Sequence, residues 1–150
     1  MNELIYHFFT DDDFLRISNK IKETEKSTAG EIRVSIKEEI PFLKRKKTIK
    51  ELAEEEFYRL GMEKTRDKTG VLLFIVLGER KFYILADEGI NEKVTPDTWG
   101  RIRSLMEDEF RNGRFTQGII KGVEEIGKVL AQHFPIKPDD TNELSNKVVI

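Results

Sequence analysis

The sequence contains no cysteine in its 150 residues, so disulfide bonds, cysteine nucleophiles and thiolate metal sites are excluded. It also lacks a long hydrophobic run, since no stretch approaches the roughly 18 apolar residues that a membrane-spanning helix needs. The N-terminus shows no basic segment followed by an apolar stretch and a small-residue cleavage site, the pattern of a secretory signal peptide. These absences predict a cytoplasmic protein without a membrane span.

An excess of either charge is missing as well. The chain has 26 Lys and Arg residues against 28 Asp and Glu residues, a formal net charge of -2. A nucleic-acid-binding protein normally carries a basic excess that neutralises phosphates, so we expect no nucleic-acid partner. The length suits one domain with a substantial core. We predict a single domain over residues 1–134, followed by a polar, extended tail over residues 135–150.

Hydrophobic periodicity predicts three strands and four helices. Apolar and polar residues alternate from Glu31 to Lys37, as in a half-buried strand, whereas Gly70 to Leu77 is apolar throughout and predicts a buried strand. A tight turn at Gly78 leads into the strand Lys81 to Ala86, so these two strands form a hairpin. The predicted helices run from a Thr10 cap to about Lys26, from beyond Pro41 to Gly61, from Thr95 or Asp97 to near Gly113, and from about Thr116 to Phe134.

The basic run Lys44 to Lys47 lies at the beginning of the second predicted helix. Four consecutive basic residues are able to bind phosphate or nucleic acid. Acidic residues lie close by in the sequence, however, and mixed charge of this kind is typical of a solvated helix face. We interpret the run as the solvated start of that helix.

The order of the elements predicts a three-layer α/β/α sandwich, with a mixed sheet that contains a β-hairpin and about four flanking helices. A crossover helix makes the first two strands parallel, and the hairpin makes the third antiparallel to the second. The beginnings of the first two strands therefore share one edge of the sheet with the end of the third.

Carboxylates from distant segments are expected to meet at that edge. They are Glu31, Asp67, Asp87, Glu88 and Asp97, together called the acidic rim below. Oxygen ligands without sulfur or nitrogen favour calcium or magnesium over zinc or copper. Acids are also common at loop tips, Glu31 is equally suited to the exposed start of a strand, and Asp97 to a helix cap. The rim is thus either a cation site or a set of solvated loop residues.

Other catalytic patterns are weak. His7 and His133 lie outside the predicted rim and offer no metal-binding pair. The serines lack the context of a nucleophile elbow, and Gly113 to Gly118 lacks the lysine and serine of a phosphate-binding loop.

With these residues in view, the chain resembles the TPM domain family, in particular its short, stand-alone bacterial members. The family is shared by a thylakoid-lumen acid phosphatase, a photosystem II repair factor and a nematode receptor-associated membrane protein. The resemblance covers nearly the whole chain. Its segments are STAGEIRV (27–34), TGVLLFIVLGERKFYILADEGINEKV (69–94), TPDTW (95–99), FRNGRFTQGIIKGVEEIG (110–127) and FPIKPDDTNEL (134–144).

The resemblance implies a central sheet sandwiched by helices and, in some members, cation binding through acidic loops and hydrolysis of phosphate monoesters. By position, the family's acid at the start of the first strand corresponds to Glu31, its turn before the second strand to Thr69 and Gly70, and its acidic loop to residues 87–89. This chain departs from the pattern at Thr69, where asparagine is frequent, and at Glu88, which adds negative charge.

Extra negative charge favours a cation and repels a phosphate dianion. We therefore expect a protein that binds a divalent cation, calcium or magnesium, at the rim and acts as a binding or assembly module for a protein partner. The alternative is a metal-dependent phosphatase that hydrolyses a phosphorylated small molecule with the same residues.

Overall fold

The computed structural model describes residues 2–136 and 144–150. Its centre is a three-stranded sheet with the order β1-β2-β3, formed by β1 (Glu31–Lys37), β2 (Gly70–Val76) and β3 (Lys81–Ala86). Strand β1 is parallel to β2, and β3 is antiparallel to β2. The mixed sheet with a hairpin is therefore confirmed, and the strand boundaries agree with the predicted ones to within one residue.

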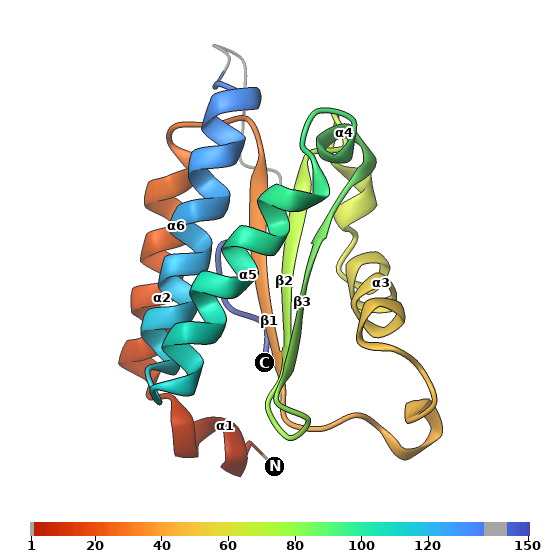
Figure 1. Cartoon of the computed structure of the whole chain (residues 1–150), viewed down its shortest axis with the longest axis vertical. Coiled ribbons are helices and arrows are strands. Elements are labelled where there is room, and N and C mark those ends of the chain that lie inside the picture. The colour runs from red at the N-terminus through yellow and green to blue at the C-terminus, as the bar shows by residue number, and fades with distance from the viewer. Residues whose placement is uncertain (1, 137–143) are drawn as a thin grey trace.

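Helices cover both faces of this sheet (Figure 1). The long helices α2, α5 and α6 lie on one side and α3 lies on the other, which confirms the α/β fold with about four main helices. None of the helices described is long and apolar enough to cross a membrane. The helices are α1 (Glu3–Phe8), α2 (Asp11–Glu25), α3 (Ile49–Arg59), α4 (Glu88–Asn91), α5 (Pro96–Arg111) and α6 (Phe115–His133), with short 3-10 turns η1 (Phe42–Lys44) and η2 (Met62–Lys64).

The interpretation of Lys44 to Lys47 as the start of a helix is wrong. Helix α3 begins at Ile49, where Thr48 forms a capping box, and the basic run lies in the preceding connection. Lys44 and Lys47 both pair with Glu55 of α3, which holds that connection against the helix. A run of charges does not mark where a helix begins, whereas a side-chain cap fixes the first turn.

The core follows from the side-chain alternation of the strands. Ile32, Val34 and Ile36 of β1 are buried towards α2 and α6, while β2 is apolar on both of its faces and is buried along its full length. The opposite face of β1 carries polar side chains, among them Ser35. The sheet therefore packs a large apolar core on one side and a smaller core, shared with a polar group, on the other.

That polar group is centred on Glu56 of α3, whose residue is only 6% exposed. Its carboxylate accepts hydrogen bonds from Ser35 Oγ at 2.5 Å and from Arg59 Nε at 2.7 Å, and Lys37 Nζ lies 3.2 Å away. Burial by itself would raise the pKa of this carboxyl. The hydrogen bonds from Arg59 and Ser35 and the charge of Lys37 outweigh burial and lower the pKa to about 2.

Glycines allow α6 to pack closely against its neighbours. A Cβ added to Gly122 would lie 2.5 Å from Met106 Sδ of α5, and one added to Gly127 would overlap Thr24 Cγ2 of α2. Glycine costs helix stability, so its repeated use here indicates that backbone proximity is needed.

Residues 144–150 lie beside the outer edge of β1. Ile36 donates its backbone N–H to the carbonyl of Val149, and Val149 donates to Val34, both at 2.8 Å. The bridge is parallel, with Ser35 opposite Val149. The rest of the tail that the sequence predicts as extended, residues 137–143, lies outside the described residues.

Candidate functional site at the acidic rim

The predicted edge of the sheet does bring three distant segments together. Glu31 is in register with Gly70 at the start of the parallel pair, and Asp87 donates its backbone N–H to the Gly70 carbonyl at 2.9 Å. The rim lies at the end of the sheet near α4 in Figure 1. The strand topology alone fixes this arrangement, because parallel strands begin at the same edge.

Gly89 connects two of these segments through close backbone packing. A Cβ at this position would lie 2.5 Å from the carbonyl oxygen of Lys68 and closer still to that of Asp67. Any side chain here would push the loop before β2 away from α4. The carbonyl oxygens of residues 67 and 68 therefore lie directly against the loop that carries Asp87.

Asp87 is the N-cap of the short helix α4. Its Oδ1 accepts a hydrogen bond from the Glu88 backbone N–H at 2.8 Å. Its Oδ2 is buried and has no hydrogen-bond partner in the part of the chain that the structure describes. One carboxylate oxygen thus serves the helix, and the other makes no polar contact among the described residues.

The remaining rim acids are dispersed. Glu88 and Asp97 are exposed, the latter in the first turn of α5, where Thr95 and not Asp97 is the N-cap. The Asp67 side chain is 41% exposed and lies 3.6 Å from Arg66 Nε. Within residues 2–136 and 144–150, no three His, Asp or Glu side chains are gathered closely enough to hold a metal ion. A cation at the rim would need ligands other than carboxylates.

Glu31 is placed differently from the exposed strand start that the sequence allows. It is 3% exposed, and its Oε1 accepts a hydrogen bond from the Leu144 backbone N–H at 2.7 Å. Its carboxylate therefore helps to hold the C-terminal segment.

Glu25, at the end of α2, was not among the residues predicted for the acidic rim. Its Oε2 accepts the Ile32 backbone N–H at 2.7 Å, and its Oε1 accepts Asn146 Nδ2 at 2.5 Å. Burial and, to a smaller extent, the nearby negative charge of Glu31 raise the pKa of Glu25 to about 7, although the two hydrogen bonds act in the opposite direction. The only signal in the sequence was its position directly before the turn into β1.

Comparison with known proteins identifies the family. The TPM domain family matches residues 6–129, well over half of the chain. The chain belongs to the TPM domain family. No curated protein matched it.

Solved structures of TPM-like folds agree with this assignment. The chain is 34% identical to the BA42 protein of the psychrophilic bacterium Bizionia argentinensis, with a TM-score of 0.86 over 95% of this chain and 94% of that one. The N-terminal domain of a P. gingivalis protein is 19% identical, with a TM-score of 0.69 over 85% and 79% of the two chains. The N-terminal domain of the cg2496 protein of Corynebacterium glutamicum is 11% identical, with a TM-score of 0.61 over 81% and 74%. The last two similarities concern the fold alone.

Proposed function

We propose that this TPM-domain protein binds a divalent cation, calcium or magnesium, at the rim around Asp87 and works as a binding or assembly module for a protein partner. The observation that supports the proposal is the buried Asp87 Oδ2, which has no hydrogen-bond partner among the described residues. A buried carboxylate oxygen without a partner is costly, and a bound cation would remove that cost.

The ligand set would be mixed. Asp87 supplies a carboxylate oxygen, and the loop that packs on Gly89 supplies carbonyl oxygens and the side chain of Asp67. Carboxylates, backbone carbonyls and water together are common ligands of calcium, which tolerates irregular geometry. Magnesium demands a nearly ideal octahedron, so we expect calcium to bind more tightly. Glu88 and Asp97 add negative potential around the site.

The phosphatase alternative depends on the same site. A bound cation would supply Lewis-acid activation of water and charge neutralisation for a phosphate monoester. Without a cation, the rim acids would repel that dianion. Turnover of p-nitrophenyl phosphate that requires the metal, and that Asp87→Asn abolishes, would favour the enzyme over the binding module.

Calorimetric titration of the metal-stripped protein with calcium, and then with magnesium, tests the proposal. We expect saturable heat in the unaltered protein and its loss in Asp87→Asn. Asp12→Asn, which removes an exposed acid from α2, is the matched control and should bind as the unaltered protein does. Absence of saturable heat in the unaltered protein would overturn the cation site and with it the phosphatase alternative.

A further inference from the structure

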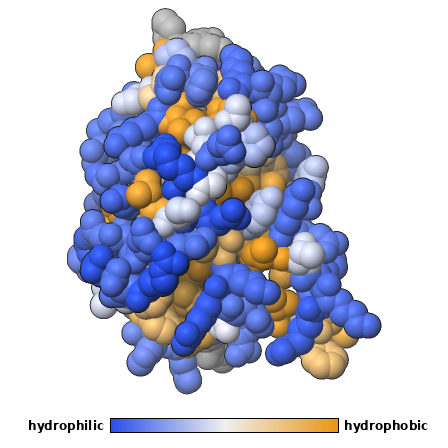
Figure 2. All heavy atoms as spheres, in the orientation of Figure 1, coloured by the Kyte–Doolittle hydropathy of each residue, from blue (hydrophilic) through white to orange (hydrophobic). Residues whose placement is uncertain are grey.

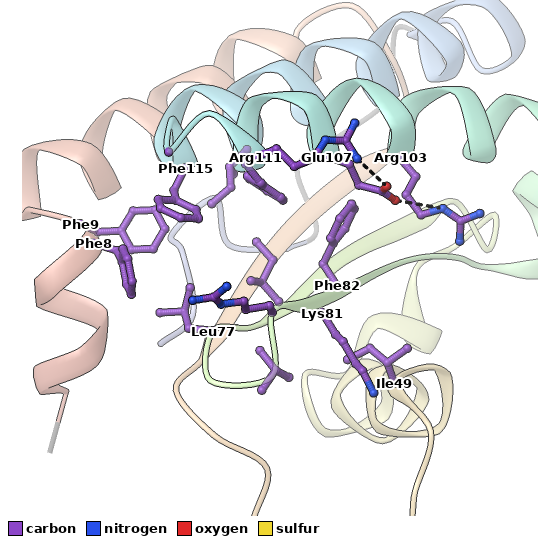
Figure 3. Close-up of a pocket in the computed structure, with 16 residues that line it drawn as sticks. Phe8, Phe9, Ile49, Leu77, Lys81, Phe82, Arg103, Glu107, Arg111 and Phe115 are labelled. Carbon is purple, nitrogen blue, oxygen red and sulfur yellow. Dashed lines mark ion pairs between the residues drawn. The ribbon is translucent and has the colours of Figure 1, made fainter.

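A cavity of about 780 Å³ lies at the opposite end of the sheet from the rim (Figure 3). It is bounded by the end of β2, the start of β3, the C-terminal half of α5, and the ends of α1 and α6 that face this side. Its volume falls within the range of about 300–1,000 Å³ that is usual for small-molecule pockets. The site does not involve any rim residue and is independent of the proposed function.

The interior of the cavity is apolar. Ten of the sixteen lining residues have apolar side chains. Four phenylalanine rings form one wall in unbroken contact, with centroids 4.9 Å apart for Phe8 and Phe115, 5.9 Å for Phe115 and Phe110, and 5.3 Å for Phe110 and Phe82. In the orientation of Figure 1, apolar side chains also reach the surface between hydrophilic ones in the lower part of the molecule (Figure 2). A ligand that fits this wall needs an apolar chain or ring.

The lining is basic where it is charged. Arg80 and Lys81 come from the hairpin, and Arg103 and Arg111 come from α5. Among the described residues that line the cavity, Glu107 is the only acid, and it is shared by both α5 arginines, 3.7 Å from Arg103 Nε and 4.0 Å from Arg111 Nη1. Four basic residues against one acid leave a net charge of +3 around an apolar interior.

Arg80, in the turn of the hairpin, is the lining cation left open to a ligand. Within the described part of the chain, neither Arg80 nor Lys81 forms an ion pair, whereas Arg111 is also paired with Asp108. Figure 3 shows Lys81 directed from the hairpin towards Ile49, away from Phe82, Arg111 and Glu107, so Lys81 does not face the phenylalanine wall. An anionic group seated near the hairpin would meet unpaired positive charge while the remainder of the molecule contacts the phenylalanine wall.

From this arrangement we infer that the cavity binds a small amphiphilic anion, a single apolar chain or ring that ends in a carboxylate or similar group. Apolar contact accounts for the body of the ligand, and Arg80 selects the sign of its charge. A neutral or cationic amphiphile of equal size would gain the apolar contact alone and would bind more weakly. The occupant is a free molecule, because the volume of the cavity lies in the range that is usual for small-molecule pockets.

Decanoate, kept below its micelle concentration, is a suitable probe. In two-dimensional amide NMR we expect saturable shifts at Leu77, Phe82 and Phe115. Acetate has the charge without the chain, and decyltrimethylammonium has the chain with the opposite charge. Both should leave these amides unshifted at the same concentration.

Two variants assign the binding to this cavity. Arg80→Gln should weaken decanoate at least about tenfold, which corresponds to about 1.4 kcal/mol. Lys22→Gln removes the same charge from an exposed position on α2 and should leave the affinity unchanged. Leu77→Trp fills the cavity with a larger apolar side chain and should abolish the shifts. Amide spectra with native dispersion confirm that each variant is folded.

Three results would overturn the inference. The first is the absence of saturable shifts with decanoate, and the second is equal binding of decanoate and decyltrimethylammonium, which would indicate unspecific apolar contact. The third is co-sedimentation with anionic phospholipid vesicles that depends on Arg80 while free decanoate does not bind, which would make this region a membrane-docking surface.

Discussion

The carboxylate of Glu31, the first residue of β1, accepts a hydrogen bond from the backbone N–H of Leu144, 113 positions further along the chain. Beside it, Glu25 accepts a hydrogen bond from Asn146. Two carboxylates near the start of β1 thus hold the C-terminal segment against the sheet. A residue that the sequence assigns to a cation site also has a structural task.

Replacement of this anchor should release the C-terminal segment. We expect Glu31→Ala to lower the free energy of unfolding by about 1–3 kcal/mol, because the partly buried N–H of Leu144 loses its acceptor. Amide hydrogen exchange should accelerate at Val149, which is bonded to Val34, and not at Leu73 in the central strand. Glu92→Ala, at an exposed position, is the control. Unchanged protection of Val149 would contradict the anchoring role.

Glu25 should make stability depend on pH in the mildly acidic range. Its pKa is about 7 in the folded protein and near 4.5 when unfolded, so the folded state binds the proton more tightly. The stabilisation is complete below pH 4.5 and is lost as the pH rises to 7, by about 1–3 kcal/mol in total.

Urea unfolding at several pH values between 4.5 and 8 measures this effect. Glu25→Gln cannot titrate, so the difference in unfolding free energy between the two proteins should change over that range and then become constant. Glu23→Gln, two positions earlier and mostly exposed, should retain the pH dependence of the unaltered protein. Parallel curves for the unaltered protein and Glu25→Gln would show that Glu25 has an ordinary pKa.

Glu56 should make stability depend on pH in the opposite direction to Glu25. Its lowered pKa means that it stabilises the fold above pH 4.5 and that this contribution disappears as the pH falls towards 2. We expect Glu56→Ala to cost about 1–3 kcal/mol at neutral pH, since Ser35 and Arg59 lose a charged acceptor. Thermal unfolding compared with Glu54→Ala, an exposed acid on the same helix, gives the measurement. Equal unfolding temperatures for the two variants would refute it.

Two glycine replacements should change the stability of the protein in opposite directions. Gly100 of α5 has open space around its Cα, so Gly100→Ala should stabilise the protein by about 0.5–1 kcal/mol through helix propensity. Gly127→Ala would overlap Thr24 and should destabilise the protein by about 1–3 kcal/mol despite the same gain. Chemical denaturation of both variants measures these changes in the free energy of unfolding. Stabilisation by Gly127→Ala would contradict the prediction, because it would mean that α2 and α6 can move apart without cost.

Local patterns predicted most of the fold because its main elements carry strong local signals. Strand β1 alternates, β2 is apolar throughout, and a capping box at Thr10 marks the start of α2. Helices α1 and α4 were missed, since six and four residues are too short for a helical period to show. What looked like an acidic loop after β3 is in part a helix turn capped by Asp87.

For the candidate site, the sequence predicted only its location at one edge of the sheet. Topology fixed the edge at which Glu31, Gly70 and Asp87 meet, but it could not fix which carboxylates would be exposed, capped or bonded. Glu25 and Asn146 are 121 positions apart in the sequence. No local sequence pattern predicts a contact between residues so far apart. The phenylalanine wall likewise joins residues from four elements and has no common spacing in the sequence.

The C-terminal segment, residues 144–150, also limits which other strands can pair with β1. An exposed strand edge is a template for strand addition by another chain. Here Val149 already occupies backbone donors and acceptors of β1, and it is tethered to the same molecule. Its effective concentration at that edge is on the order of millimolar or more, as for other intramolecular partners. A competing strand from a second protein would have to exceed that local concentration, so this edge resists both aggregation and adventitious pairing.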